Sequence, residues 1–541
     1  MNSPINSNRR IEIYDTTLRD GSQGEGISFS VVDKIRIARR LDEFGVDYIE
    51  GGWPGSNPKD VEFFTQMKDI TLHHATLSAF GSTRKAGVKA ENDPQLRTLL
   101  ESGAPAITLF GKSWENHVRY ALHVSMDENL SMISDSVGFL KRHISRVLYD
   151  AEHFFDGFKD NCEYALKCLQ AAKDAGADCL VLCDTNGGTL PDELWEIVNA
   201  VQVAFPQSAI GIHPHNDSAC GVANALTAVK AGVIQVQGTV NGYGERCGNC
   251  DLIPVISALR LKMGCDCLLP DSLSHLTAIS QYVDEIANLT PSIHRPYVGR
   301  SAFAHKGGVH TDAVLKGASY EHIAPESVGN TRRILVSELA GGSSIAGKAA
   351  EYGFDLHRRS PETRALLNTI TRMEHEGYSY EGSEASFELL LMKSMGTYRD
   401  LFALHGFRCI IEKRGADQKT ATEATVKLAV DGQERLTVAE GDGPVHALDG
   451  ALRRALADFY PALESIKLTD FKVRVVNTRA GAAARVRVMI DSSDGETSWS
   501  TVGVSENIIE ASWLALTDSV IYGLFRSEQR YREITSQVST L

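Results

Sequence analysis

The sequence predicts an α/β protein in which a TIM (β/α)8 barrel comes first and a smaller α+β domain, built from a duplicated βββα unit, comes last. From residue 11 to about 263, short β-rich segments alternate with amphipathic helices, and eight strand segments are found. Eight parallel strands joined by helices in ~250 residues are typical of a TIM barrel. The total of 541 residues exceeds what one hydrophobic core usually organises, so further domains are expected.

The eight strand segments are short and apolar, as expected of strands buried on both faces. The helices between them have recognisable ends: Ser30 precedes one that Gly45 ends, and Pro191 opens another. Because TIM barrels place their active sites at the C-terminal ends of the strands, functional residues are expected there. The strand segments cover residues 11–15, 47–52, 73–80, 106–112, 143–152, 179–185, 209–215 and 234–240.

The chain is predicted to divide into the barrel at 1–275, helical linker subdomains at 276–400 and a C-terminal domain at 401–541. In the last region, three strands and a helix occur twice, and aligning Pro444 with Ile508 superposes the two helices. Such an internal duplication forms a pseudo-symmetric domain, a common route to a dimer and to a ligand pocket. A homodimer is therefore expected.

Composition excludes several classes of protein. With 43% hydrophobic and 23% charged residues the chain is an ordinary folded protein, and its net charge of -14 disfavours nucleic-acid or membrane-surface partners. No signal peptide or run of ~20 apolar residues is evident, which indicates a cytoplasmic protein with reduced thiols. A zinc ribbon is disfavoured because Cys247, Cys250, Cys265 and Cys267 are spaced too loosely for one.

Polar residues gather where two predicted strands end. Arg19 and Asp20 follow the first strand, and His213 and His215 end the seventh, two residues apart and therefore on one face. Asn249 adds an oxygen donor from the glycine-rich loop after the eighth strand, unless it only caps the next helix. This mixed oxygen and nitrogen set is compatible with manganese, magnesium or zinc.

Three motifs carry a resemblance to a known family. DTTLRDG at 15–21, HPHND at 213–217 and NGYGERCGN at 241–249 resemble the 2-isopropylmalate synthase, homocitrate synthase and citramalate synthase family. HKGGVHTDAVLKG at 305–317 resembles that family's linker, and the duplicated tail resembles its amino-acid-binding regulatory domain. The resemblance implies a metal-dependent acyltransferase that condenses acetyl-CoA with a 2-oxo acid.

The resemblance also implies roles for individual residues. Glu152 would lie near the acetyl group; the alternative is that it pairs with Arg19 and only orients it. The base that takes the acetyl proton is Glu152, His310 or a water. Catalytic roles are implied for Arg19, Glu152, His310 and Asp312; substrate binding for Arg19, Asp20 and Tyr320; and metal binding for Asp20, His213, His215 and Asn249.

The acceptor is suggested by two longer stretches. DGSQGEGISFSVVDK and YIEGGWPGSNPKD are most similar to the citramalate synthase branch, which implies pyruvate as acceptor, (R)-citramalate as product and a place in isoleucine biosynthesis. The alternative is 2-isopropylmalate synthase activity on 2-oxoisovalerate in leucine biosynthesis. A different class is a catalytically inactive amino-acid sensor. A branched-chain amino acid is the expected effector at the C-terminal domain.

Overall fold

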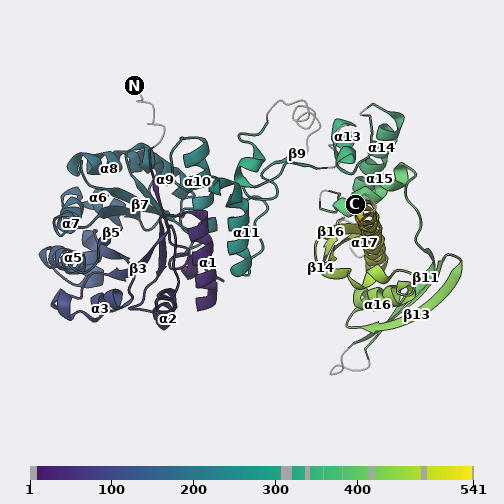
Figure 1. Ribbon diagram of the computed structural model, residues 1–541, viewed down its shortest axis with the longest axis horizontal. Coiled ribbons are helices and arrows are strands. Elements are labelled where there is room, and N and C mark those ends of the chain that lie inside the picture. The colour runs from purple at the N-terminus through teal and green to yellow at the C-terminus, as the bar shows by residue number, and fades with distance from the viewer. Residues whose placement is uncertain are drawn as a thin grey trace. The chain divides into compact units, whose positions relative to one another are not determined.

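The computed structural model describes residues 9–305, 320–335, 342–357, 359–380, 382–413, 420–476 and 484–538. Among them, the residues up to 303 and those at 321–332 form one compact unit. The residues at 304–305, at 320 and from 333 onward form the other. Figure 1 shows the helices and strands of both units.

The first unit contains a closed barrel of eight parallel strands, which confirms the predicted fold. Neighbouring strands follow the order of the chain, and β8 closes the barrel on β1, with Glu12 opposite Gln235. Two strands begin three residues later than predicted. At one of them the amides of His73, His74 and Ala75 donate to the carboxylate of Asp42 at 2.7–2.8 Å, before the strand begins. The strands are β1 (Glu12–Asp15), β2 (Tyr48–Gly52), β3 (Thr76–Ser82), β4 (Ala106–Lys112), β5 (Arg146–Glu152), β6 (Cys179–Asp184), β7 (Ile210–Pro214) and β8 (Gln235–Gly238).

Helices cover the outside of this barrel (Figure 1). The first shows why they begin and end where they do: Ser30 and Asp33 form a reciprocal capping box, and Gly45 ends the helix in the left-handed region at φ 92°. The principal helices are α1 (Val31–Phe44), α2 (Pro58–Met67), α3 (Pro94–Glu101), α5 (Met126–Lys141), α7 (Cys162–Asp174), α8 (Pro191–Ala204), α9 (Gly221–Lys230), α10 (Leu252–Leu261) and α11 (Leu276–Ile286).

The inside of the barrel is polar along part of its length. Tyr14, Glu50, Gln235 and Gln237 are fully buried there, whereas the apolar core lies between the strands and the surrounding helices. Buried polar groups must be hydrogen-bonded to be tolerated, so these side chains are held in fixed arrangements. They connect the bottom of the barrel with the ends of the strands where the candidate site lies.

The second unit begins with the helices α13 (Gly342–Glu351), α14 (Pro361–His375) and α15 (Glu384–Ser394). Two copies of a three-stranded antiparallel sheet with one helix follow, which confirms the predicted duplication. Ala447 and Ala511, aligned by the sequence, are both fully buried at the inner faces of the two helices. The copies are β11 (Ala403–Glu412), β12 (Ala421–Val430), β13 (Gln433–Gly441) and α16 (Pro444–Leu456), then β14 (Lys467–Val475), β15 (Val486–Ser493), β16 (Ser498–Ser505) and α17 (Ile508–Val538).

Helix α17 contains one stretch, Ile508–Glu528, that is long and apolar enough to cross a membrane, which corrects the expectation that no such run exists. Of its most apolar window, 61% is buried inside the protein. Ala511 and Leu516 pack into the core of the domain, and Trp499 of β16 donates from Nε1 to the carbonyl of Ser519 at 3.1 Å. This burial is typical of the core helix of a folded domain.

Candidate active site

Three side chains that could hold a metal ion converge at the C-terminal mouth of the barrel. Asp20 follows β1, and His213 and His215 lie at the end of β7. Oδ2 of Asp20 lies 3.1 Å from Nε2 of His213 and 3.8 Å from Nε2 of His215. All three are buried, and their ligand atoms lie within 4.8 Å of one another. The structure thus brings together Asp20 and His213, which are 193 positions apart in the chain, as expected for strands of one barrel.

The fourth predicted ligand lies against this group. Nδ2 of Asn249 is 2.8 Å from Oδ2 of Asp20 and 3.0 Å from Nε2 of His213, so its amide nitrogen faces the group. Oδ1 of Asn249 and Nδ1 of His215 are buried without a hydrogen-bond partner among the described residues. Unpaired buried polar atoms are costly, and this oxygen and nitrogen donor set fits a divalent cation.

Electrostatics favour the metal-binding forms of two of the three residues. Burial opposes ionisation of Asp20, but Arg19 and the two imidazoles outweigh it and hold the pKa of Asp20 far below its ordinary value. Burial, followed by the charge of His213, lowers the pKa of His215 to about 4. Asp20 is therefore ionised and His215 neutral near pH 7, and these are the forms that bind metals. For the third, burial opposes protonation, but the hydrogen bond with Asp20 outweighs it and raises the pKa of His213, so a cation has to displace its proton.

Arg19 is held beside the metal-ligand group by a carboxylate that the sequence analysis did not identify. Its Nε lies 2.5 Å from Oε2 of Glu50, and its Nη1 lies 3.4 Å from Oδ1 of Asp20. Its guanidinium stacks over the ring of Phe80, 3.7 Å from the centroid. The alternative in which Glu152 pairs with Arg19 is wrong, because Glu152 pairs with Lys112 at 2.5 Å.

A cavity of about 190 Å³ opens next to these residues. One wall is aromatic: Trp53 packs edge-on against Phe80 and Phe110, which stack on each other. The polar side includes both Glu152 and Asp150. Burial raises the pKa of Asp150 to about 7, so this carboxyl is largely protonated below neutral pH. The cavity is lined by Arg19, Asp20, Gln23, Trp53, Phe80, Phe110, Asp150, Glu152, Cys183, Thr185, His213, His215, Glu245 and Arg246.

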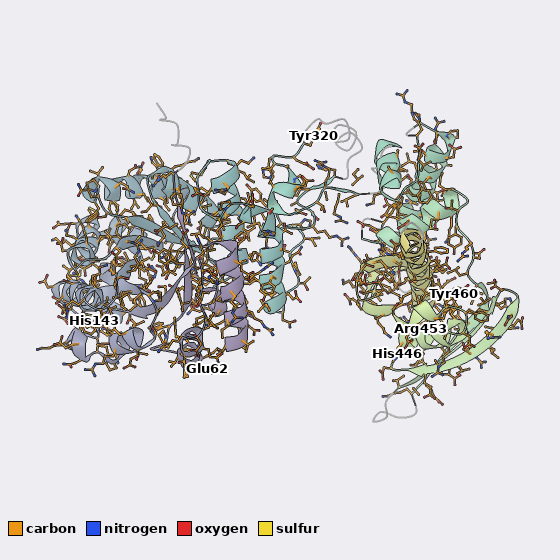
Figure 2. The ribbon with its side chains drawn as sticks, viewed as in Figure 1. Glu62, His143, Tyr320, His446, Arg453 and Tyr460 are labelled. Atoms are coloured by element: carbon orange, nitrogen blue, oxygen red, sulfur yellow. The ribbon has the colours of Figure 1, made fainter. Side chains whose placement is uncertain are left out.

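The structure does not test the roles of three predicted site residues. His310 and Asp312 fall outside the described residues. Tyr320, labelled in Figure 2, belongs to the other compact unit and is 53% exposed. The roles of these residues stay predictions. Glu50 was not predicted as a site residue. One signal was present in the sequence, because the Glu50 carboxylate lies in the middle of a largely apolar strand segment.

Residues 10–283 match the HMGL-like family. Residues 297–377 match the domain described as homocitrate synthase post-HMGL domain-like, and residues 381–524 match the LeuA allosteric (dimerisation) domain. These three matches follow the same order as the barrel, the linker helices and the duplicated tail.

Curated relatives span nearly the whole chain. The (R)-citramalate synthase of Geobacter sulfurreducens is 54% identical, covering 96% of this chain and 98% of that protein. The (R)-citramalate synthase of Aquifex aeolicus is 52% identical over 96% of this chain and 99% of its own length. The probable 2-isopropylmalate synthase of Methanopyrus kandleri is more distant, at 32% identity over 97% of this chain and 99% of its own length. The chain therefore belongs to the (R)-citramalate synthase family of HMGL-like proteins.

Proposed function

We propose that the protein is an acyltransferase that condenses acetyl-CoA with pyruvate, giving (R)-citramalate and CoA. One observation carries this proposal: a buried Asp20, His213 and His215 group lies beside Arg19 in a cavity of about 190 Å³. The identity to (R)-citramalate synthases supports the choice of reaction. We further propose that the enzyme works in isoleucine biosynthesis in the cytoplasm.

We infer that Asp20, His213 and His215 hold a divalent cation, which is manganese, magnesium or zinc, with Asn249 as a further ligand if its amide rotates. Such a cation would supply a Lewis acid for the keto group of the acceptor. The ionised Asp20 reduces the net charge that the site must carry, and the neutral His215 provides a lone pair.

The chain's own residues then provide orientation and charge. Arg19, fixed by Glu50 and Phe80, is placed to bind acceptor oxygen and to stabilise negative charge as the new carbon–carbon bond forms. Glu152 lines the same cavity and is the described candidate for removing a proton from the acetyl methyl group. Hydrolysis of the product thioester releases CoA. His310 and Asp312 remain candidates for acetyl-CoA activation, and Tyr320 remains a candidate for substrate binding.

The aromatic wall favours a small acceptor. Trp53, Phe80 and Phe110 limit the space beside Arg19, and 2-oxoisovalerate carries two more carbons than pyruvate. Each methylene that a pocket cannot accommodate reduces binding by ~1–3 kcal/mol. Weaker acceptance of 2-oxoisovalerate than of pyruvate is therefore expected.

Release of free thiol from acetyl-CoA, measured with a panel of 2-oxo acids and with and without EDTA, tests the proposed function. We expect release with pyruvate at the highest kcat/KM and loss of release after EDTA treatment. A preference for 2-oxoisovalerate would support the leucine-pathway alternative. No release with any acceptor would support the inactive sensor, and release that persists without metal would overturn the mechanism.

We also propose that the second unit binds a branched-chain amino acid, isoleucine, and that it lowers activity. A cavity of about 630 Å³ lies at the start of α16, where Leu468 and Phe471 offer apolar contact and Asp449 and Arg453 offer both charges. Oδ1 of Asp449 is buried without a partner among the described residues. Figure 2 labels His446 and Arg453 at this place. Asp449→Asn is expected to weaken inhibition by isoleucine, and unchanged inhibition would refute this location.

A homodimer is proposed from the same unit. Edge strand β14 leaves a row of apolar side chains, Phe471, Val473 and Val475, each 42–48% exposed. Exposed apolar side chains in a row on an edge strand promote association, and a second copy of the chain would cover them. Sedimentation of the full chain is expected to give twice the monomer mass, and a monomer at micromolar concentration would refute the proposal.

A further inference from the structure

Two buried glutamines and the partly exposed Glu12 connect the metal-ligand group with the bottom of the barrel. Nδ1 of His213 lies 2.8 Å from Oε1 of Gln237. Nε2 of Gln237 lies 3.4 Å from Oε1 of Gln235, and Nε2 of Gln235 lies 2.9 Å from Oε2 of Glu12. Gln235 and Gln237 are two residues apart on β8, so both point into the barrel, where each is fully buried.

Glu12, at the bottom of the barrel, determines which atom donates in each of these hydrogen bonds. Glu12 is paired with Arg146 at 3.2 Å, so its carboxylate can only accept from Nε2 of Gln235. The oxygen of Gln235 is then left to accept from Nε2 of Gln237, which also donates to Oδ1 of Asp150 at 3.3 Å. Because the nitrogen of Gln237 faces two acceptors, its oxygen must face His213.

An oxygen at this place selects one tautomer of the imidazole. An amide oxygen has no proton to give, so Nδ1 of His213 carries the hydrogen and donates it to Gln237. In the neutral imidazole, Nε2 then keeps its lone pair on the side of Asp20, where a cation would bind. The partner of the second ring nitrogen is known to orient metal-bound histidines and to change metal affinity 10–100-fold when it is removed.

We propose that Gln237 is a positioning residue for the metal site, which fixes His213 in the tautomer and ring orientation that present Nε2 to the cation. Asp150 and Gln235 fix the orientation of the Gln237 amide in turn. This inference rests on the proposed function, since it presupposes a cation at Asp20, His213 and His215. The Gln237 amide is neutral, so it adds no negative charge to His213. A cation bound to His213 would therefore be a stronger Lewis acid than if a carboxylate accepted from the imidazole.

The test measures metal affinity rather than activity, by titrating Co²⁺ into the metal-free full chain and following its visible absorption. Gln237→Met removes the acceptor and is expected to weaken Co²⁺ binding 10–100-fold. Gln237→Glu restores an acceptor oxygen and is expected to bind Co²⁺ at least as tightly as the unmodified chain. Thermal unfolding of each metal-free variant shows whether the fold is retained.

Asn224→Leu is the matched control. Asn224, on α9, is also a fully buried amide, and its Nδ2 donates to the carbonyl of Thr189 at 2.8 Å rather than to a metal-ligand side chain. This variant is expected to bind Co²⁺ within twofold of the unmodified chain. The inference about Gln237 would be overturned if Gln237→Met bound Co²⁺ as tightly as the unmodified chain. It would also be overturned if Gln237→Met and Gln237→Glu weakened Co²⁺ binding equally. Failure of the unmodified chain to bind Co²⁺ would instead overturn the proposed metal site itself.

Discussion

Removal of the Glu50 carboxylate tests how firmly the fold fixes Arg19. Glu50 is fully buried and accepts from Nε of Arg19 at 2.5 Å and from the hydroxyl of Tyr14 at 2.8 Å. Glu50→Ala leaves the largely buried guanidinium without this partner, and breaking a buried ion pair in this way costs ~3–5 kcal/mol. Glu50→Gln loses the negative charge and the acceptor for Tyr14 but keeps an oxygen that can accept from Arg19, so a smaller cost of ~1–3 kcal/mol is expected.

Urea unfolding followed by tryptophan fluorescence, to which Trp53 beside Phe80 contributes as one of five tryptophans, measures these free energies. Glu62→Ala is the control, because Glu62 is an exposed glutamate of α2, labelled in Figure 2, and its loss is expected to change stability by less than ~0.5 kcal/mol. A loosened Arg19 is also expected to lower kcat by ~10²–10³. A Glu50→Ala variant with the stability and kcat of the control would refute the account of Arg19.

Three other predictions concern stability and specificity. Burial raises the pKa of Asp150 from 3.8 to about 7, so the folded barrel disfavours the ionised form; this destabilisation is absent below pH 4 and grows until pH 7. Asp150→Asn is therefore expected to stabilise the metal-free chain against urea by ~4 kcal/mol at most at pH 8, and equal effects at pH 4 and pH 8 would contradict this. Phe110→Leu widens the cavity and is expected to raise the kcat/KM ratio of 2-oxoisovalerate to pyruvate by ~10-fold, whereas an unchanged ratio would remove the aromatic wall from the account. Ser30→Ala removes the helix cap and is expected to lower the free energy of unfolding by ~1 kcal/mol in the same titration, and no loss would show that Asp33 alone suffices.

The architecture could be predicted from the sequence because residues close together in the chain mark the helix ends and the strands. Ser30 and Gly45 mark a helix by their own chemistry, and an apolar strand segment can be recognised without knowing its neighbours. The convergence of Asp20 with His213 also followed, once the barrel fixed where strands end. The predicted starts of two strands were less accurate. At one of them, the carboxylate of Asp42 on helix α1 accepts from the backbone amides of residues 73–75, and the strand begins only after them.

The supporting side chains of the site could not be predicted in the same way. Glu50 and Gln237 act through partners more than 20 residues away in the sequence, and only the barrel interior brings them to Arg19 and His213. The pairing of Glu152 with Lys112 depends on the register between β4 and β5, in which these two residues lie opposite each other. Such contacts are set by strand register rather than by local pattern.

The central claim is that Asp20, His213 and His215 together hold one cation. Anomalous diffraction at the zinc edge, from crystals of the full chain grown with Zn²⁺, locates that ion directly. We expect a peak at ~2.0–2.2 Å from the carboxylate of Asp20 and from both imidazoles. A map with zinc bound elsewhere and no peak between these three side chains would contradict the account.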